Sequence, residues 1–256
     1  MTKPGKIAKS KRWLLWSLGS WYSDGGLLYQ LVRDFYPNRP LPSRSQFPRH
    51  LSQPPNTPPR EHVVRAGLER SDIVRTLRSL APNDHAVLFY PDIGAKRELV
   101  FPFLQDALDQ EGVAVYATEH EPLDELREAM KHWGIYVDKC EQNRSLTITD
   151  CETLMTAEER LTSLKTSRLL SDLMERLIRG RVLVRIVTDA TALANRGMVD
   201  RLIQWERTLG RRLELPLTMI CCYEETVASL KEGEFLVDTL QTHSHAVFPG
   251  IALQLA

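Results

Sequence analysis

The stretch HAVLFYPDIGAKRELV, residues 85–100, has the form of the opening of a nucleotide-binding domain. Residues 86–90 are a continuous apolar run rich in β-formers, which predicts a buried strand. A loop with Gly94 and Lys96 follows, and apolar residues from Leu99 onward then recur at helical spacing. The stretch therefore predicts strand, loop and helix in succession. It leaves open whether the loop binds phosphate.

The same unit recurs along the chain. Further strands are predicted at 113–118, 145–150, 181–189 and 215–223, with one or two short strands in the last residues. Helices are predicted at 71–80, 96–110, 122–133, 198–210 and 234–243, and one or two helices at 157–179. Alternating apolar strands and helices of this length specify an α/β fold, a mostly parallel sheet with helices on both faces.

Residues 1–70 differ in composition from the rest of the chain. They carry 12 basic and 4 acidic side chains and nine of the 15 prolines, whereas the whole chain has 33 of each charge. Proline clusters such as PPNTPPR (54–60) interrupt helices and sheets. We expect residues 1–70 to be a basic, Trp- and Pro-rich extension or linker, largely disordered, and residues 71–256 to be the folded domain.

The Trp-rich segment 12–32 has three interpretations: an interfacial membrane anchor, a segment packed on the main domain, or translation of an over-long gene model. Its apolar run is too short for a transmembrane helix, and none is expected. Four cysteines without disulfide or CxxC spacing favour a reducing cytoplasm. The balanced charge offers no argument for specific nucleic-acid binding.

Two resemblances follow from these residues. The 86–90 strand with its loop and helix, VYATEHEPLDELREAMKHWG (115–134), SLTITD (145–150) and VLVRIVTDATAL (182–193) resemble in their order the RecA-like core of KaiC-type ATPases. NDHAVLFY (83–90), QWE (204–206), ICCYEE (220–225) and LQTHSHAVFPG (240–250) are similar to the MEDS sensory domain, a degenerate relative of that core. The resemblances imply a RecA-like sheet in a signalling protein.

The loop after the first strand departs from a P-loop. The motif GxxxxGK[ST] turns backbone N–H groups toward the phosphates and supplies a hydroxyl for Mg²⁺. Here the sequence is YPDIGAKREL, with one glycine, Arg97 in the place of the hydroxyl residue, and Asp92 adding negative charge. Tight binding of Mg·ATP is therefore not expected.

Ligands of parallel sheets bind beyond the carboxyl ends of the strands, which makes the residues there candidates for a binding site. We favour a solvated first helical turn for Lys96 and Arg97, with a small anionic ligand at Lys96 as the alternative. The resemblance implies that Asp189 stands at the position where the ATPase relatives hold Mg²⁺ through water; the alternative is that it caps the next turn together with Thr191. The resemblance implies that Glu119 and Glu121 correspond to the acidic residues that activate water.

The remaining candidates come from the MEDS resemblance, which implies that Glu206, Tyr223 and Glu224 line a pocket; the alternative is that the tyrosine packs and the glutamates are solvated. His85, at the start of its strand, is expected to be a structural hydrogen bonder. His243 and His245 form an HxH pair with no third ligand in view, so no metal is expected.

Three functions follow. The first is a non-catalytic sensory or regulatory module that needs no cofactor and binds a small ligand or a signalling protein partner, with homo-oligomerisation possible in principle. The second is a KaiC-like ATP-binding protein or weak ATPase with a non-standard loop. The third is DNA regulation through the basic extension, which lacks a helix-turn-helix pattern. Loss of the P-loop residues favours the first.

Overall fold

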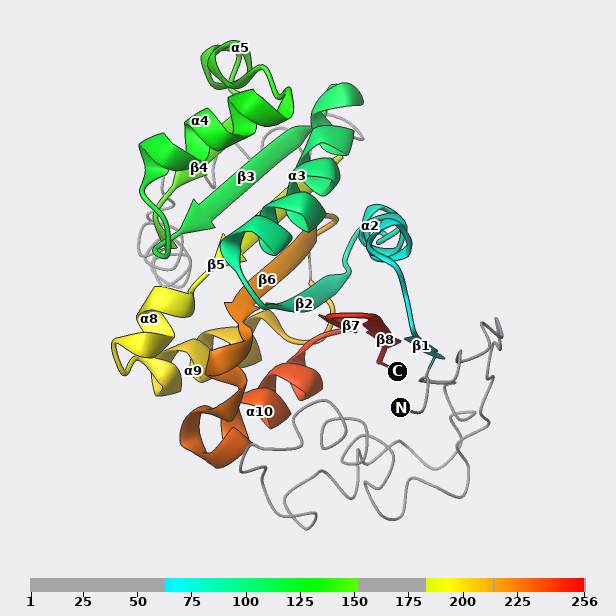
Figure 1. The fold of residues 1–256 in the computed structure, drawn as a ribbon, viewed down its shortest axis with the longest axis vertical. Helices are drawn as coiled ribbons and strands as arrows, with labels where there is room; N and C mark the ends of the chain where they lie inside the picture. Colours follow the sequence, from blue (N-terminus) through cyan, green and yellow to red (C-terminus); the bar gives the residue numbers. More distant parts are fainter. Residues whose placement is uncertain (1–62, 152–182, 214, 256) are drawn as a thin grey trace, which may run out of the picture.

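A computed structural model describes residues 63–151, 183–213 and 215–255 (Figure 1). Within these ranges the strands form one sheet in the order β1 (Val63–Ala66), β8 (Ile251–Gln254), β7 (His245–Phe248), β2 (His85–Tyr90), β6 (Thr218–Glu224), β5 (Val184–Asp189), β3 (Val113–Thr118), β4 (Leu146–Thr149). The strands from β7 to β4 run parallel, and β8 and β1 are antiparallel to their neighbours. The predicted α/β fold with a mostly parallel sheet is confirmed.

Both faces of the sheet are covered by helices. On one face, the α3 face, lie α2 (Arg70–Arg78), α3 (Ile93–Asp109) and α4 (Leu123–Trp133). On the other, the α9 face, lie α8 (Thr191–Asn195), α9 (Val199–Leu209), the 3₁₀ segment η3 (Glu225–Gly233) and α10 (Glu234–Thr242). In Figure 1 the strands β2, β5 and β6 lie between α3 and the group formed by α8, α9 and α10.

Alternation along each strand divides the core between the two faces. Leu88 of β2 packs with α3, whereas its neighbours Val87 and Phe89 pack with the helices of the α9 face. The adjacent cysteines of β6 divide in the same way, Cys221 to the α9 face and Cys222 to the α3 face. Successive strand residues point to opposite faces, so sequence neighbours here belong to different environments.

Glycines at two helix-to-strand or helix-to-loop junctions allow the observed turns. Gly112 precedes β3, and a Cβ at this position would lie 2.4 Å from the carbonyl oxygen of Leu183. Gly134 ends α4 in the left-handed region, with φ of 107°. The first glycine lets the end of α3 approach the start of β5, which helps to set β3 beside β5.

Several features differ from expectation. β1 was not predicted, so the sheet starts before residue 71, inside the range assigned to the extension. The helix α2 begins at Arg70, one residue before the predicted start at 71, with Glu69 as its N-cap residue. The short helices α5 (Val137–Gln142) and α8 and the η3 segment were also missed, because short elements carry little periodic signal. The helices predicted at 157–179 and residues 1–62 lie outside the described residues.

Among the helices of the described ranges, none combines the length and apolar composition that crossing a bilayer requires.

Candidate functional site

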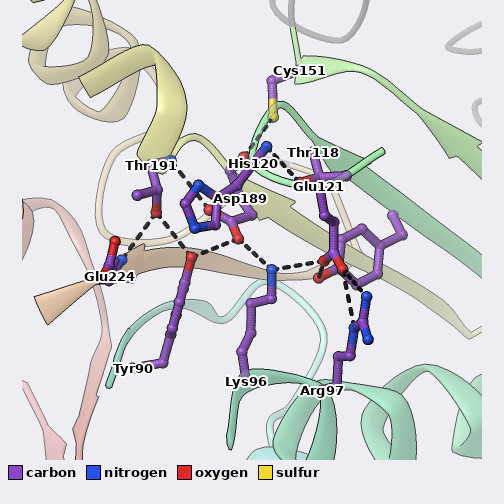
Figure 2. Close-up of polar contacts among 11 residues, drawn as sticks. Tyr90, Lys96, Arg97, Thr118, His120, Glu121, Cys151, Asp189, Thr191 and Glu224 are labelled. Carbon is purple, nitrogen blue, oxygen red and sulfur yellow. Dashed lines mark hydrogen bonds and ion pairs between the residues drawn. The ribbon is translucent and has the colours of Figure 1, made fainter. Parts of the chain in front are cut away.

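The carboxyl ends of β2, β3, β5 and β6 meet at one edge of the sheet. Side chains from α3 and from positions in or just after β2, β3 and β5 converge there, and β6 contributes a backbone N–H (Figure 2). We call this group the edge cluster; its members are Tyr90, Lys96, Arg97, Tyr116, Glu121, Asp189 and Thr191. The parallel register explains the convergence, since Thr118 of β3 pairs with Asp189 of β5.

The side chain of Asp92 closes the loop after β2. Asp92 is the N-cap residue of α3, and its carboxylate accepts a hydrogen bond from the backbone N–H of Ala95 at 2.8 Å. An added Cβ at Gly94 would lie 3.1 Å from the same carboxylate. The amide that an incoming phosphate would need is thus already bonded, and the negative charge of Asp92 lies at the helix N-terminus.

Lys96 is fully buried, so the interpretation of this residue as a solvated surface lysine is wrong. Its Nζ donates to Glu121 Oε1 at 2.8 Å and to Asp189 Oδ2 at 2.5 Å. The early start of α3 at Ile93 places Lys96 on the helix stripe that faces the sheet, with Val100 and Phe103. Burial lowers the pKa of Lys96, but the charges of Asp189 and Glu121 outweigh burial and hold the pKa above its ordinary value.

Glu121 connects the buried part of the edge cluster to its solvent-exposed margin, which we call the rim and which includes Arg97. Its second oxygen accepts from Arg97 Nε at 3.0 Å and Nη2 at 2.6 Å, and its first accepts from the Tyr116 hydroxyl at 3.1 Å. Burial raises the pKa of Glu121, yet the charge of Lys96 and its hydrogen bond, with help from Arg97, leave the pKa below its ordinary value. Arg97 is 27% exposed and is the basic group of the cluster that solvent reaches.

Of the two roles considered for Asp189, the structure shows the cap, and it adds contacts with Lys96 and Tyr90. Its Oδ1 caps the next turn by accepting from the Thr191 N–H at 3.1 Å, and its Oδ2 accepts from the Tyr90 hydroxyl at 2.8 Å in addition to Lys96. Thr191 Oγ1 accepts from the backbone N–H of Glu224 at 3.0 Å. Burial and the charge of Asp189 raise the pKa of Tyr90 far above its ordinary value, so the phenol remains a donor. The predicted capping role is confirmed.

Two of the expected residues lie around the cluster. Glu119 contacts Arg196 through a 3.3 Å ion pair, with 18% of its side chain exposed. Glu224 is half-buried and contributes its backbone N–H, as described above. Neither carboxylate is bonded to Lys96, so both belong to the rim rather than to the buried network.

Glu206 and Tyr223 lie elsewhere, and the expectation that they share a pocket with Glu224 is wrong. The Tyr223 hydroxyl donates to Glu206 Oε1 at 2.5 Å, and both side chains are fully buried on the α9 face. Tyr223 and Glu224 are consecutive strand residues and so point in opposite directions. The alternative that Tyr223 packs is confirmed, but Glu206 is not solvated.

His85, Glu206, Cys221 and His243 come together beside Tyr223; we call them the histidine cluster. His85 Nδ1 lies 2.8 Å from the Gly210 carbonyl oxygen, as expected of a structural hydrogen bonder. The pairing of His243 with His245 is wrong, because His243 follows α10 and bonds back to it while His245 bonds to Ser244. The combination of a carboxylate on α9 with residues of β2 and β6 has no sequence spacing that signals it.

The sequence did contain a signal for Lys96. Lys96, Leu99, Val100 and Phe103 recur at helical spacing, which places the lysine on the apolar stripe of α3. A basic residue on a buried stripe requires a carboxylate partner. The tyrosines Tyr90 and Tyr116 carry no comparable signal, because a strand tyrosine is often only a packing residue.

Comparisons with known proteins give one family, and the solved structures that resemble this chain include the following two. The family model for MEDS, the methanogen/methylotroph, DcmR sensory domain, matches residues 84–244. No curated protein matches. A KaiC-like protein from Pyrococcus horikoshii shows 17% identity and a TM-score of 0.43, over 65% of this chain and 72% of that one. The ORC1 protein of Aeropyrum pernix, solved in complex with DNA, shows 12% identity and a TM-score of 0.34, over 70% and 44%. Neither structural likeness carries an argument about what this chain does.

Proposed function

The chain belongs to the MEDS family of sensory domains, and from this premise we propose that it is a non-catalytic sensory or regulatory module. In this proposal it binds a small ligand or a signalling protein partner at the carboxyl edge of the sheet, with no nucleotide cofactor. A reducing, cytoplasmic setting belongs to the proposal, and it is supported by free thiols at all four cysteines.

The single observation that carries the proposal is the position of the Lys96 ammonium between Asp189 and Glu121. Phosphoryl transfer requires Mg²⁺ and phosphate at such strand-end carboxylates. A Mg²⁺ ion bound to Asp189 would lie a few ångströms from a buried ammonium, and like unit charges about 4 Å apart repel by roughly 4 kcal/mol at an intermediate dielectric. Lys96 supplies the cation that a metal would otherwise supply.

The rim offers the contacts for recognition. Arg97 and Arg196 are the basic groups there, and each is bonded to a glutamate that a ligand carboxylate or phosphate would replace. Glu121 bonds to Arg97 at the rim and to Lys96 inside the cluster. A ligand that displaces Glu121 from Arg97 therefore also changes the contacts of Lys96. The signal proposed is this rearrangement, transmitted by association with another protein or with a second copy of the chain.

A thermal shift experiment separates the sensor from the ATPase. The full chain is melted with Mg·ATP, with Mg²⁺ alone and with ATP plus a chelator. A magnesium-dependent rise in Tm on the order of 2–4 °C corresponds to about 1 kcal/mol of binding in a domain of this size and would revive the ATPase alternative. We expect no such rise, and no phosphate release in a parallel turnover assay.

The same assay with a panel of small organic acids and neutral compounds tests the positive half of the proposal. We expect a stabilising compound whose effect is lost in Arg97→Met. The matched control is Arg127→Met. Arg127 lies on α4, is 28% exposed and is likewise paired with a glutamate, Glu141 of α5. A shift that survives Arg97→Met, or that is lost equally in the control, would place recognition away from the edge.

A further inference from the structure

The histidine cluster gathers four metal-ligating side chains in the core. His85 opens β2, Cys221 lies on β6, Glu206 lies on α9 and His243 follows α10. All four side chains are fully buried, and one ligand atom from each lies within 4.8 Å of the others. The group is on the α9 face, away from Lys96, so what it binds is independent of the function proposed for the edge.

The backbone fixes the tautomer of both histidines. His85 Nδ1 lies 2.8 Å from the Gly210 carbonyl oxygen and 3.2 Å from that of Thr242. His243 Nδ1 lies 2.6 Å from the Thr239 carbonyl oxygen. A carbonyl only accepts, so each Nδ1 carries the hydrogen and each Nε2 presents a lone pair.

Burial keeps both rings neutral. It lowers the pKa of His85 to about 4, although the two carbonyl bonds oppose this, and it lowers the pKa of His243 well below its ordinary value. Neutral imidazole is the form that binds metals. At neutral pH both Nε2 atoms are therefore available as ligands.

Two ring nitrogens and one carboxylate oxygen, all acceptors, face one another at the centre of the histidine cluster, with the Cys221 thiol as a donor beside them. Each Nε2 lies 3.4 Å from the same oxygen, Glu206 Oε2. Cys221 Sγ lies 3.2 Å from His85 Nε2, and His243 Nε2 has no hydrogen-bond partner among the described residues. Lone pairs that converge in a dry core repel unless a cation lies between them.

We propose that His85, Glu206, Cys221 and His243 bind one divalent transition-metal ion of the zinc class. Ligands at Zn–N and Zn–O lengths of about 2.0–2.1 Å stand roughly 3.3–3.4 Å apart on a tetrahedron. The two nitrogen–oxygen separations of 3.4 Å have this length. The sulfur needs about 3.6 Å, given its longer bond, so Cys221 and His85 separate by a few tenths of an ångström on binding.

Charge and surroundings support the same assignment. One thiolate and one carboxylate neutralise a divalent ion, which leaves no net charge in the apolar core. The thiol proton of Cys221 leaves to solvent when the Cys221–metal bond forms. The carbonyls on each Nδ1, and the Tyr223 hydroxyl 2.5 Å from Glu206 Oε1, are outer partners of the kind that orient metal ligands.

With four protein ligands and no exposed position, the ion is structural rather than hydrolytic. It would join α9 and the end of α10 to the start of β2 and to β6, fixing the helices of the α9 face on the sheet. Removing it is expected to loosen these helices while leaving α3 and the edge cluster in place.

Metal analysis of the full chain, purified with no polyhistidine tag from zinc-supplemented cells, tests the proposal. We expect about one zinc ion per chain, and a loss of at least about tenfold in affinity in Cys221→Ser and His243→Gln. The matched control is Cys222→Ser, because Cys222 is equally buried but faces α3. Equal loss of zinc in the control would overturn the assignment.

A measurement on the unaltered protein guards against variants that fail to fold. Exchange into Co²⁺ is expected to give the visible bands of tetrahedral cobalt and a thiolate-to-cobalt band in the near ultraviolet. Chelation is expected to lower Tm by about 5 °C or more. Three results together would refute the proposal: less than about 0.1 zinc ion per chain, no cobalt band, and a Tm that does not change with chelator. They would show that a proton bridges the histidine cluster instead.

Discussion

The edge cluster and the histidine cluster share a strand, since β2 contributes Tyr90 to the first and His85 to the second, and both are buried. In the edge cluster the chain supplies its own cation, and Lys96 contacts both Asp189 and Glu121. In the histidine cluster the Nε2 atoms of His85 and His243 each lie 3.4 Å from the Glu206 carboxylate, and no lysine or arginine is among the four members. Lys96 neutralises the buried carboxylates of the edge cluster, whereas Glu206 of the histidine cluster accepts from the Tyr223 hydroxyl and faces two imidazoles.

The largest expected effect comes from breaking the edge cluster. Lys96→Met keeps the length of the side chain but leaves Asp189 and Glu121 buried without their cation. We expect a loss of about 3–5 kcal/mol in the free energy of unfolding, measured by urea denaturation.

Lys139→Met is the control, because Lys139 lies exposed on α5 and the same replacement there should change stability by less than about 0.5 kcal/mol. Two variants of equal stability would mean that the Lys96 ammonium is dispensable in the folded state.

The next effect tests the histidine cluster. Tyr223→Phe removes the hydroxyl that donates to Glu206, and a hydrogen bond to a charged group contributes about 1.5–3 kcal/mol. Tyr136→Phe is the matched control, since Tyr136 is 79% exposed. A Tyr223→Phe protein as stable as this control would show that Glu206 does not depend on the phenol.

A smaller effect concerns the loop itself. Asp92→Ala removes the N-cap of α3, which typically costs about 1 kcal/mol. Asp109→Ala, at the other end of the same helix, removes a negative charge from a helix C-terminus and should be neutral or slightly stabilising. Equal losses in both would mean that the cap does not hold the loop closed.

The smallest expected effect is the loss of stability in acid that comes from protonating Glu121. Its pKa in the folded chain is lowered from 4.5, so the folded state favours the charged form. The stability it provides is complete above the unfolded pKa of 4.5 and is lost as pH falls through the lower folded value. Urea midpoints below pH 4.5 should therefore fall more steeply in the wild type than in Glu121→Gln. Parallel slopes would contradict the charged pair.

Much of the fold could be predicted from the sequence, because buried parallel strands are continuous apolar runs bounded by glycine and proline. The runs at 86–90 and 113–118 became β2 and β3, and the helix predicted at 122–133 became α4, which ends at Gly134. β1 could not be predicted in the same way. It is a four-residue edge strand whose partner, β8, lies at the other end of the chain.

The site could be predicted only in part. Strand ends pointed to Asp189, Thr191 and Glu121, which do meet, because parallel register brings strand ends together. The sequence favours a solvated Lys96 because isolated basic residues usually lie at the surface. In the structure Lys96 is buried, since it lies on the face of α3 that packs against the sheet. Glu206 and Tyr223 were joined to the wrong site, since spacing along the chain does not say which face of a sheet two elements share.

We propose that the Lys96 ammonium occupies the position where a nucleotide-bound metal would lie. A crystal structure of the chain grown with excess Mg²⁺ and a non-hydrolysable ATP analogue tests it most directly. We predict Lys96 Nζ still within hydrogen-bond distance of Asp189 and Glu121, with neither metal nor phosphate between them. A magnesium ion at Asp189, with phosphates wrapped by residues 91–97 and Lys96 turned toward them, would contradict it.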